Sequence, residues 1–317
     1  MRSTALVAAM LTTVGVLSAA CGSSAADVQA GDCFRTGTAA AFGWGTEVPC
    51  DRPHSVEVFA VRDVTALFGS TPRRALEEEG NPARQRYLSL ITEFCEPAWS
   101  DYSGFGELGS SLTPRAVVLP AIYGDMALEA SPAADWDAGK KIVTCYQVLG
   151  RPGADGEQAI SVDRPVLTML GRAPAAVPLQ VRDCAMSPVV INTVADQREK
   201  RVPCQEPHDR EYLGHLNLAQ FVGLVPGLDQ AFLDRFNSAS APAKDWAVLD
   251  GLCGRIFRSL PGASRPDITL LAQVYTGDKT WGWADKGAYH AACFARTGQQ
   301  ATRSVVGIGD RPLAPPG

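Results

Sequence analysis

The sequence lacks the motifs that mark most catalytic and metal-binding sites. Its nine cysteines form no C-x-x-C pair, so neither a zinc ribbon nor a thioredoxin-like redox motif is indicated. There is no H-E-x-x-H, S-x-x-K or G-x-S-x-G, and no P-loop or G-x-G-x-x-G stands in the strand-to-helix context that those motifs require. We therefore expect a protein that is not an enzyme, with no catalytic residue, no metal and no cofactor.

Strong charge and long apolar runs are also missing. The net charge is −5 at pH 7, which argues against a nucleic-acid partner and against electrostatic binding to anionic lipid. Beyond the N-terminus, no apolar segment approaches the roughly 20 residues that a membrane-spanning helix needs. The sequence therefore predicts no nucleic-acid binding and no spanning helix.

The N-terminus has the pattern of a secretory signal. An apolar run from Ala5 to Ala20 is too short and too rich in alanine for a membrane span. It leads directly to Cys21, as in a bacterial lipobox, although the usual leucine stands one place early, at Leu17. This resemblance implies a diacylglycerol on Cys21, whereas an ordinary cleaved signal is the alternative. We predict a signal peptide at residues 1–20 and a lipid anchor that holds the protein on the extracytoplasmic face of the cell membrane.

One pattern occurs twice in the chain. V-P-C-x-x-P-H-x-x-E begins at Val48 and again at Val202. Around each occurrence the order is the same: a cysteine, this element, a helical pattern with a third cysteine, a strand pattern, and then a tryptophan, a glycine and a fourth cysteine. Both helical patterns begin with Pro-Ala and a basic residue, and proline is favoured in a first helical turn. The order predicts two tandem α+β domains, each an antiparallel sheet with a helix on one face.

Matching the two copies gives the expected bounds. Residues 21–30 form a tether, repeat 1 covers 31–172, and repeat 2 covers 178–313, with proline and alanine accumulating between the repeats. In this match the strand-like run RAVVLPAIYGD from Arg115 corresponds to ITLLAQVYTGD from Ile268.

Eight cysteines remain if Cys21 carries lipid, four in each copy. An even number in an exported protein is typical of disulfides. Four cysteines allow three pairings, and the sequence alone does not choose between them. We favour first with second and third with fourth, because the first two flank adjoining strand segments and the last two would join the helix to the final strand. The favoured pairs are Cys33–Cys50, Cys95–Cys145, Cys184–Cys204 and Cys253–Cys293.

Three elements of the first copy carry a resemblance to a known family. G-D-C-F from Gly31, V-P-C-D-R-P-H-S-V-E-V from Val48 and W-x-x-G-x-x-x-x-x-C from Trp136 resemble the septum-formation-related domain family of actinobacterial lipoproteins and membrane proteins. The resemblance covers nearly all of the chain after the signal, as two copies. It implies a role in the cell envelope and in cell division, and no known chemistry. The second copy departs from it, with R-D-C-A-M in place of G-D-C-F and Tyr212 in place of a valine, so it could have lost what the first copy binds.

The Pro-His-x-x-Glu element allows two main interpretations. His54 with Glu57, and His208 with Glu211, could each reach one ion or substrate, because imidazole with carboxylate suits zinc or general-base chemistry. Two ligands are too few for a stable zinc site. Alternatively, the histidine ties a turn to backbone groups and the glutamate opens the next strand, a device that should recur in every copy of the fold. We favour the turn, with a partner-binding edge and a metal-dependent or catalytic site as the alternatives.

Tryptophans complete the set of candidate binding residues. Exposed aromatic side chains can stack on sugars or anchor a protein partner, although tryptophans more often fill a core. We expect a binding or scaffold protein for an envelope, cell-division or cell-wall partner. The candidate binding residues are His54, Glu57, Trp136, His208, Glu211, Trp281 and Trp283.

Overall fold

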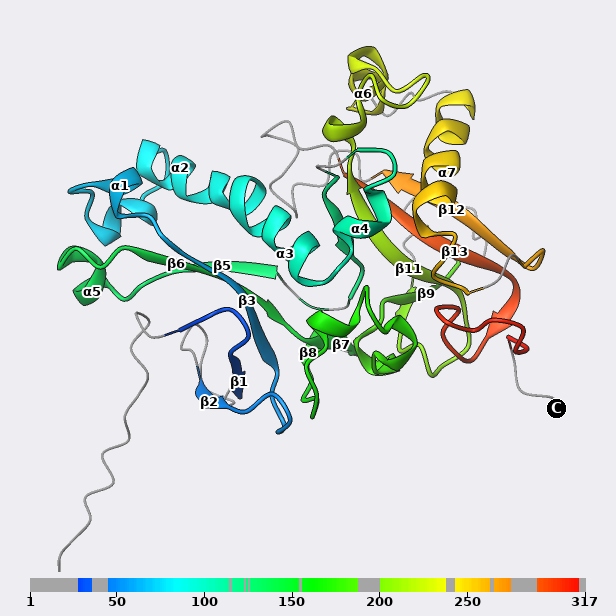
Figure 1. The fold of residues 1–317 in the computed structure, drawn as a ribbon, viewed down its shortest axis with the longest axis horizontal. Coiled ribbons are helices and arrows are strands. Elements are labelled where there is room, and N and C mark those ends of the chain that lie inside the picture. The colour runs from blue at the N-terminus through cyan, green and yellow to red at the C-terminus, as the bar shows by residue number, and fades with distance from the viewer. Residues whose placement is uncertain are drawn as a thin grey trace, which may run out of the picture.

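The computed structural model describes residues 28–35, 45–113, 116–122, 124, 126–153, 156–187, 200–237, 243–262, 265–274 and 290–313. The expected signal peptide, the lipidation residue Cys21 and the tryptophans Trp281 and Trp283 lie outside this part of the chain. Within it the protein is α+β, with two large antiparallel sheets and helices packed on them (Figure 1).

The two large sheets repeat one strand order. The first runs β2-β1-β3-β6-β5 and the second β10-β9-β11-β13-β12. The strands of the first are β1 (Cys33–Arg35), β2 (Thr46–Val48), β3 (Val56–Asp63), β5 (Met126–Ala130) and β6 (Ile142–Val148). Those of the second are β9 (Cys184–Met186), β10 (Lys200–Val202), β11 (His208–Asn217), β12 (Ile268–Val274) and β13 (His290–Ala301). A separate hairpin joins β7 (Gly150–Gly153) to β8 (Gly156–Ala159).

The helical patterns that hold the third cysteine of each copy, Cys95 and Cys253, form helices in the structure. In the first half, α2 (Pro82–Leu90), a π-helical segment (Ile91–Cys95) and α3 (Glu96–Tyr102) follow one another without a break. Asn81 caps the start, where its side chain accepts a hydrogen bond from the Ala83 amide at 2.9 Å, and Pro82 takes the first helical position. In the second half α7 (Ala243–Phe257) packs on β12 and β13.

Shorter helices and turns connect these elements. The other helices are α1 (Thr65–Phe68), α4 (Gly106–Gly109), α5 (Ala133–Asp137) and α6 (Gln230–Asn237). The 3₁₀ turns are η1 (Arg73–Leu76), η3 (Leu167–Met169), η4 (Pro174–Ala176), η5 (Leu179–Val181) and η7 (Leu218–Phe221). No described helix combines the length and the apolar character that a membrane crossing requires.

One strand of the first half belongs to the second sheet. β4 (Val118–Pro120) pairs antiparallel with β11, with Leu119 opposite His215. At the next position of β11, Gly214 leaves the space that β4 occupies, because a Cβ there would lie 2.6 Å from the Leu119 carbonyl oxygen. The match of the run from Arg115 with the run from Ile268 is therefore wrong. β5, which pairs with β6 as β12 pairs with β13, holds the place of β12 in the first sheet.

The two halves also share one hydrophobic core. The largest buried cluster contains Trp99 and Phe105 from the first half together with Leu252 and Phe257 from the second. The Phe105 and Phe257 rings lie 6.3 Å apart between centroids. The largest of the buried clusters thus extends across the expected boundary between the copies.

Four disulfides join the cysteines in the favoured way. Each half has one bond between its first strand and the turn after its second strand, and one between its long helix and its last long strand. The pairs are Cys33–Cys50, Cys95–Cys145, Cys184–Cys204 and Cys253–Cys293.

Candidate functional site

The first Pro-His-x-x-Glu element lies in the interior. His54 is 0% exposed and Glu57 is 2% exposed. The Glu57 carboxylate accepts two backbone hydrogen bonds, from the Val166 amide at 2.5 Å and from the Leu167 amide at 2.9 Å. These amides open the 3₁₀ turn η3, whose first N–H groups lack partners within the turn. Glu57 therefore fixes the C-terminal segment of the first half to strand β3.

The His54 ring is held from both sides. Its Nδ1 lies 2.8 Å from the Arg52 carbonyl oxygen, and its Nε2 lies 3.1 Å from Glu57 Oε1. Both neighbours are acceptors, so the geometry suits an imidazolium that donates from both nitrogens. Burial lowers the pKa of His54, but the bonds to Glu57 and Arg52 and the charges of Glu57 and Asp163 outweigh it and raise the pKa above its usual 6.5. The ring thus ties the turn to the strand through both of its nitrogens.

The second element repeats this construction, but two of the three hydrogen-bond partners of the glutamate differ. Glu211 is also buried, and its carboxylate accepts hydrogen bonds from the Val305 amide at 2.6 Å and the Ser304 hydroxyl at 2.7 Å. Arg182 Nη1 donates to the same carboxylate at 3.3 Å. Arg182 stands where the first half has Gly31, at the second position before the first cysteine. A buried arginine has thus joined the glutamate in the second half.

The histidine of the second half keeps only part of its contacts. His208 Nδ1 lies 2.8 Å from the Glu206 carbonyl oxygen, as in the first half. Its Nε2 is buried and has no hydrogen-bond partner in the part of the chain that the structure describes. Arg182 thus supplies the side-chain contact to Glu211 that His54 supplies to Glu57.

One group of described residues is compact enough to suggest a metal ion. Ligand atoms of Cys184, His208 and Glu211 lie within 4.8 Å of one another. The Cys184 sulfur is bonded to Cys204, however, so it offers no thiolate. The Glu211 oxygens already hold an amide, a hydroxyl and a guanidinium. His208 alone has a free lone pair to offer, which does not favour a metal-dependent site.

Trp136 is also part of the interior. It is 0% exposed, and its Nε1 donates to the Thr71 carbonyl oxygen at 2.9 Å. Phe68 packs edge-on against its ring, and the Lys141 ammonium lies 4.7 Å from the ring centroid. Of the candidate binding residues, the five that the structure describes, His54, Glu57, Trp136, His208 and Glu211, are therefore all buried.

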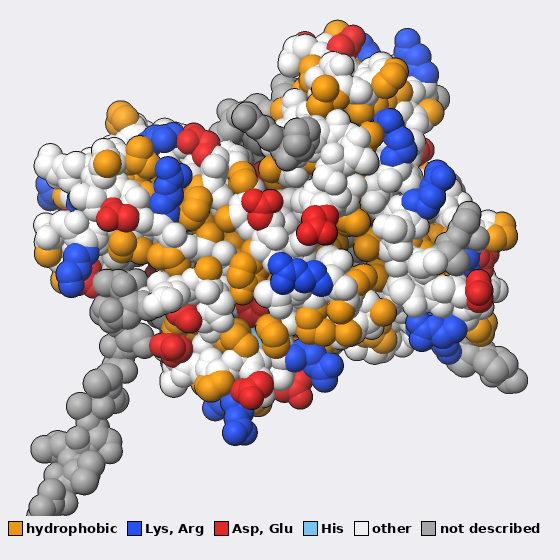
Figure 2. All heavy atoms as spheres, viewed as in Figure 1, with side chains coloured by type: hydrophobic (Ala, Val, Ile, Leu, Met, Phe, Trp, Pro, Cys, Tyr) orange, Lys and Arg blue, Asp and Glu red, His pale blue; other side chains and the backbone are white. Residues whose placement is uncertain are grey.

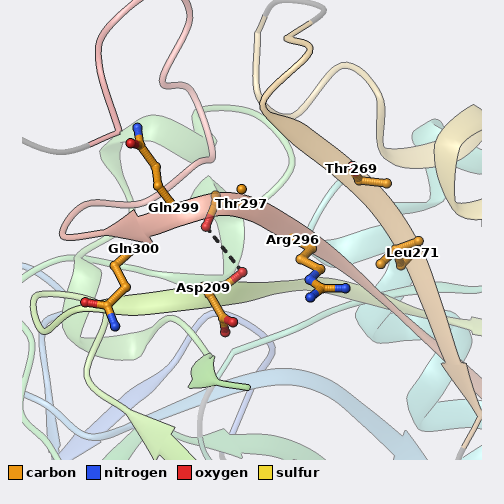
Figure 3. A pocket seen from close by; sticks show the side chains of 8 residues that line it. Asp209, Thr269, Leu271, Arg296, Thr297, Gln299 and Gln300 are labelled. Atoms are coloured by element: carbon orange, nitrogen blue, oxygen red, sulfur yellow. Dashed lines mark hydrogen bonds between the residues drawn. The ribbon is translucent and has the colours of Figure 1, made fainter. Parts of the chain in front are cut away.

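The second sheet carries two hollows on its surface. One, of about 530 Å³, lies over the ends of β11, β12 and β13, and Figure 3 shows the Arg296 side chain extending between Asp209 and Leu271. The other, of about 460 Å³, lies between α7 and β12. Sequence reasoning missed both hollows, because they are formed by strands and a helix that meet only in the folded chain.

The protein is thus a disulfide-bonded α+β protein. The histidine and glutamate side chains of its two Pro-His-x-x-Glu elements are buried, and both glutamates bond to groups within the fold. A family model described as septum formation matches residues 30–241 as one continuous stretch. The chain therefore belongs to the septum-formation family. No curated protein and no solved structure matches the chain.

Proposed function

We propose that this protein is a lipid-anchored, extracytoplasmic binding protein that serves septum formation and catalyses no reaction. Its partner would be an envelope or cell-division protein, or a component of the cell wall. Family membership supports the link to septum formation. Four disulfides suit an exported protein, and the lipobox-like sequence before Cys21 supports the anchor.

The observation that carries this proposal is the use of the two glutamates. Glu57 and Glu211 are the groups best suited to acid–base or metal chemistry in the repeated element, and both carboxylates accept backbone amides from the end of their own half. A carboxylate committed to such bonds is a structural tie. The repeated element thus supports a scaffold, and binding is left to the surface.

One face of the molecule suits a partner without a large net charge of either sign. Figure 2 shows acidic and basic side chains interspersed over the same face of the molecule. Large single-sign patches favour polyanionic or polycationic partners, so a mixed surface fits a protein or a neutral glycan better. Two related halves in one chain also suit contact at more than one point, which strengthens attachment through effective concentration.

The anchor is tested by metabolic labelling with an alkyne fatty acid. The wild-type chain should take up the label and sediment with membranes, whereas Cys21→Ala should do neither. Labelling of the Cys21→Ala variant, or release of the unlabelled wild-type chain into the medium, would contradict the anchor.

The binding function is tested by cross-linking in living cells, with wild-type protein and Trp283→Ala at equal abundance. We expect the wild-type chain to capture specific envelope proteins or glycan strands. Capture of nothing, together with a metal ion at a fixed ratio in protein purified without chelator, would replace the binding proposal with its metal-dependent alternative.

A further inference from the structure

Strand β12 forms an edge of the second sheet and faces a hollow. It is the last strand in the order β10-β9-β11-β13-β12, so one of its sides has no strand neighbour in the described sheet. Along that side lies the hollow of about 460 Å³, lined by Asp250, Gly251 and Gly254 on the helix, by Arg258 directly after the helix, and by Ile268 and Leu270 on the strand. A groove between a helix and an edge strand is the setting in which extended peptides add to a sheet.

The backbone of β12 alternates between its neighbour and the groove. The Gly298 amide donates to the Asp267 carbonyl oxygen at 3.1 Å, which places the odd-numbered residues of β12 in hydrogen-bonded pairs with β13. The even-numbered residues therefore turn their backbone groups outward. The Ala272 amide confirms this, because it donates to Asp250 Oδ1 on α7 at 2.7 Å.

Leu270 is the open position on this edge. Asp250 occupies the Ala272 amide, and the Ile268 amide donates to the Arg265 carbonyl oxygen at 3.4 Å. No described residue supplies a partner on the outward side of Leu270, between these two. Its side chain packs against the core, so the strand is fixed while one backbone donor and one acceptor face the groove. One residue of an added antiparallel strand can bond to both.

The helix side of the groove is shaped for close approach. Gly251 has no atom within 4 Å of an added Cβ, and Gly254 has only the tip of Arg258 at 4.0 Å. Neither is among the glycines with positive φ, so the helix itself does not require them. In the first half, Glu93 and Glu96 stand at the matching places relative to the helix cysteine. Glycine is unfavourable inside a helix, and here it keeps the groove open beside the strand.

The charged residues that line the groove indicate which extended peptides it would bind. Arg258 is exposed, and no acidic partner is found for it among the described residues. The other charged groups of the groove are occupied, Asp250 by the Ala272 amide and Arg265 by Asp267 at 2.5 Å. Among the described charged groups that line the groove, Arg258 is therefore the cation without an ion-pair partner, whereas the hydrogen bond from the Ala272 amide leaves the negative charge of the Asp250 carboxylate in place.

We propose that the groove between α7 and β12 binds an extended, acidic segment of a partner protein, which adds to the sheet as a strand beside Leu270 and places a carboxylate near Arg258. This inference rests on the proposed binding function and names the class of partner. The proposal also gives Gly251 and Gly254 a role, which is to keep the groove open for the peptide; helix stability alone would favour other residues there.

The test is selection of a random twelve-residue peptide library on the full-length wild-type protein. Enriched peptides are then measured against three variants, G251A/G254A, Arg258→Ala and, as a matched control on the same helix, Arg255→Ala. We expect enriched acidic peptides that bind the glycine variant and Arg258→Ala at least about tenfold more weakly, and Arg255→Ala as tightly as wild type. Binding should also slow hydrogen exchange of the Leu270 amide.

The glycine variant has a second readout that separates binding from folding. Because alanine is the better helix former, G251A/G254A should melt at a higher temperature than wild type while it loses the peptide. The peptide-binding proposal would be overturned if no peptide were enriched, or if the enriched peptides bound the glycine variant with the same affinity as wild type. In that case partner capture in cells by the wild-type chain would still support the binding function, so the two failures are distinguishable.

Discussion

The Glu57 carboxylate accepts the amide of Val166 across 109 residues of chain, at 2.5 Å. This bond closes the first half on itself, because the segment after the last long strand returns to the strand that follows the Pro-His turn. Glu211 and Val305 repeat the relationship at 2.6 Å. A histidine–glutamate motif that resembles a catalytic pair in sequence therefore joins two distant segments of each half.

Replacing Glu57 with glutamine should destabilise the protein without changing its shape. The glutamine side chain can present one acceptor oxygen to the Val166 and Leu167 amides, but its NH₂ group would face the other amide and leave a buried donor unsatisfied. We expect a loss of about 1–3 kcal/mol in the free energy of unfolding, measured by urea denaturation. Glu93→Gln, on an exposed helix surface, should change it by less than about 0.5 kcal/mol, and an equal loss there would contradict this assignment.

The His54 tie predicts a pH dependence of stability. The pKa of His54 is raised above 6.5 in the folded protein, so the folded state holds the proton more tightly than the unfolded state does. The stabilisation is complete below the unfolded pKa and is lost as the pH rises through the folded value. The free energy of unfolding of wild type, less that of His54→Gln, should therefore fall as the pH rises above 6.5 and through the raised pKa of the folded state. A difference that grows with pH would show that the ring is neutral in the fold.

The disulfides should contribute unequally. Cys95 and Cys145 close a loop of 50 residues, and Cys33 and Cys50 close one of 17. The chain-entropy relation gives about 4 kcal/mol for the longer loop and about 3 kcal/mol for the shorter. Paired cysteine-to-alanine variants, compared by denaturation under non-reducing conditions, should lose stability in that order. The reverse order would point to native-state contacts as the larger contribution.

Gly214 should tolerate no side chain. A Cβ there would meet the Leu119 carbonyl oxygen at 2.6 Å and the Phe257 ring at 2.7 Å, so Gly214→Ala should displace β4 at a cost of about 1–3 kcal/mol. Faster hydrogen exchange at the Ala121 amide, which donates to the Leu213 carbonyl oxygen, would locate the damage. Gly298→Ala is the control, since nothing lies within 4 Å of its added Cβ. Unchanged exchange at Ala121 would mean that β4 does not depend on this glycine.

Local spacing allowed much of this fold to be predicted. The long helices were predictable because each segment begins with proline and its apolar residues and cysteine recur at helical spacing. The disulfide pairing was favoured because the first two cysteines of each copy flank adjoining strand segments, and because a bond between the last two would join the helix to the final strand. The place of β4 was not predictable, since the run from Arg115 is as strand-like as the run from Ile268. Its position depends on the small residue Gly214, which lies far along the chain.

The candidate site was predictable in kind but not in contacts. The recurrence of Pro-His-x-x-Glu in both copies indicated a structural device, yet the amides that Glu57 binds lie more than a hundred residues away. The change in the second half did leave a signal, because Arg182 stands in place of Gly31 in the cysteine motif. That an arginine there would take over the contact to Glu211 required the folded chain.

The position of β4 limits which part of this gene recombination could transfer to another protein without breaking a strand pair. Recombination that carried away only the first half would take with it a strand whose hydrogen-bonding partner had been left behind. Recombination that carried away only the second half would leave β11 with an unpaired edge at Gly214 to Leu216. The pair, and not the single repeat, is therefore the smallest unit that can be moved intact into another protein.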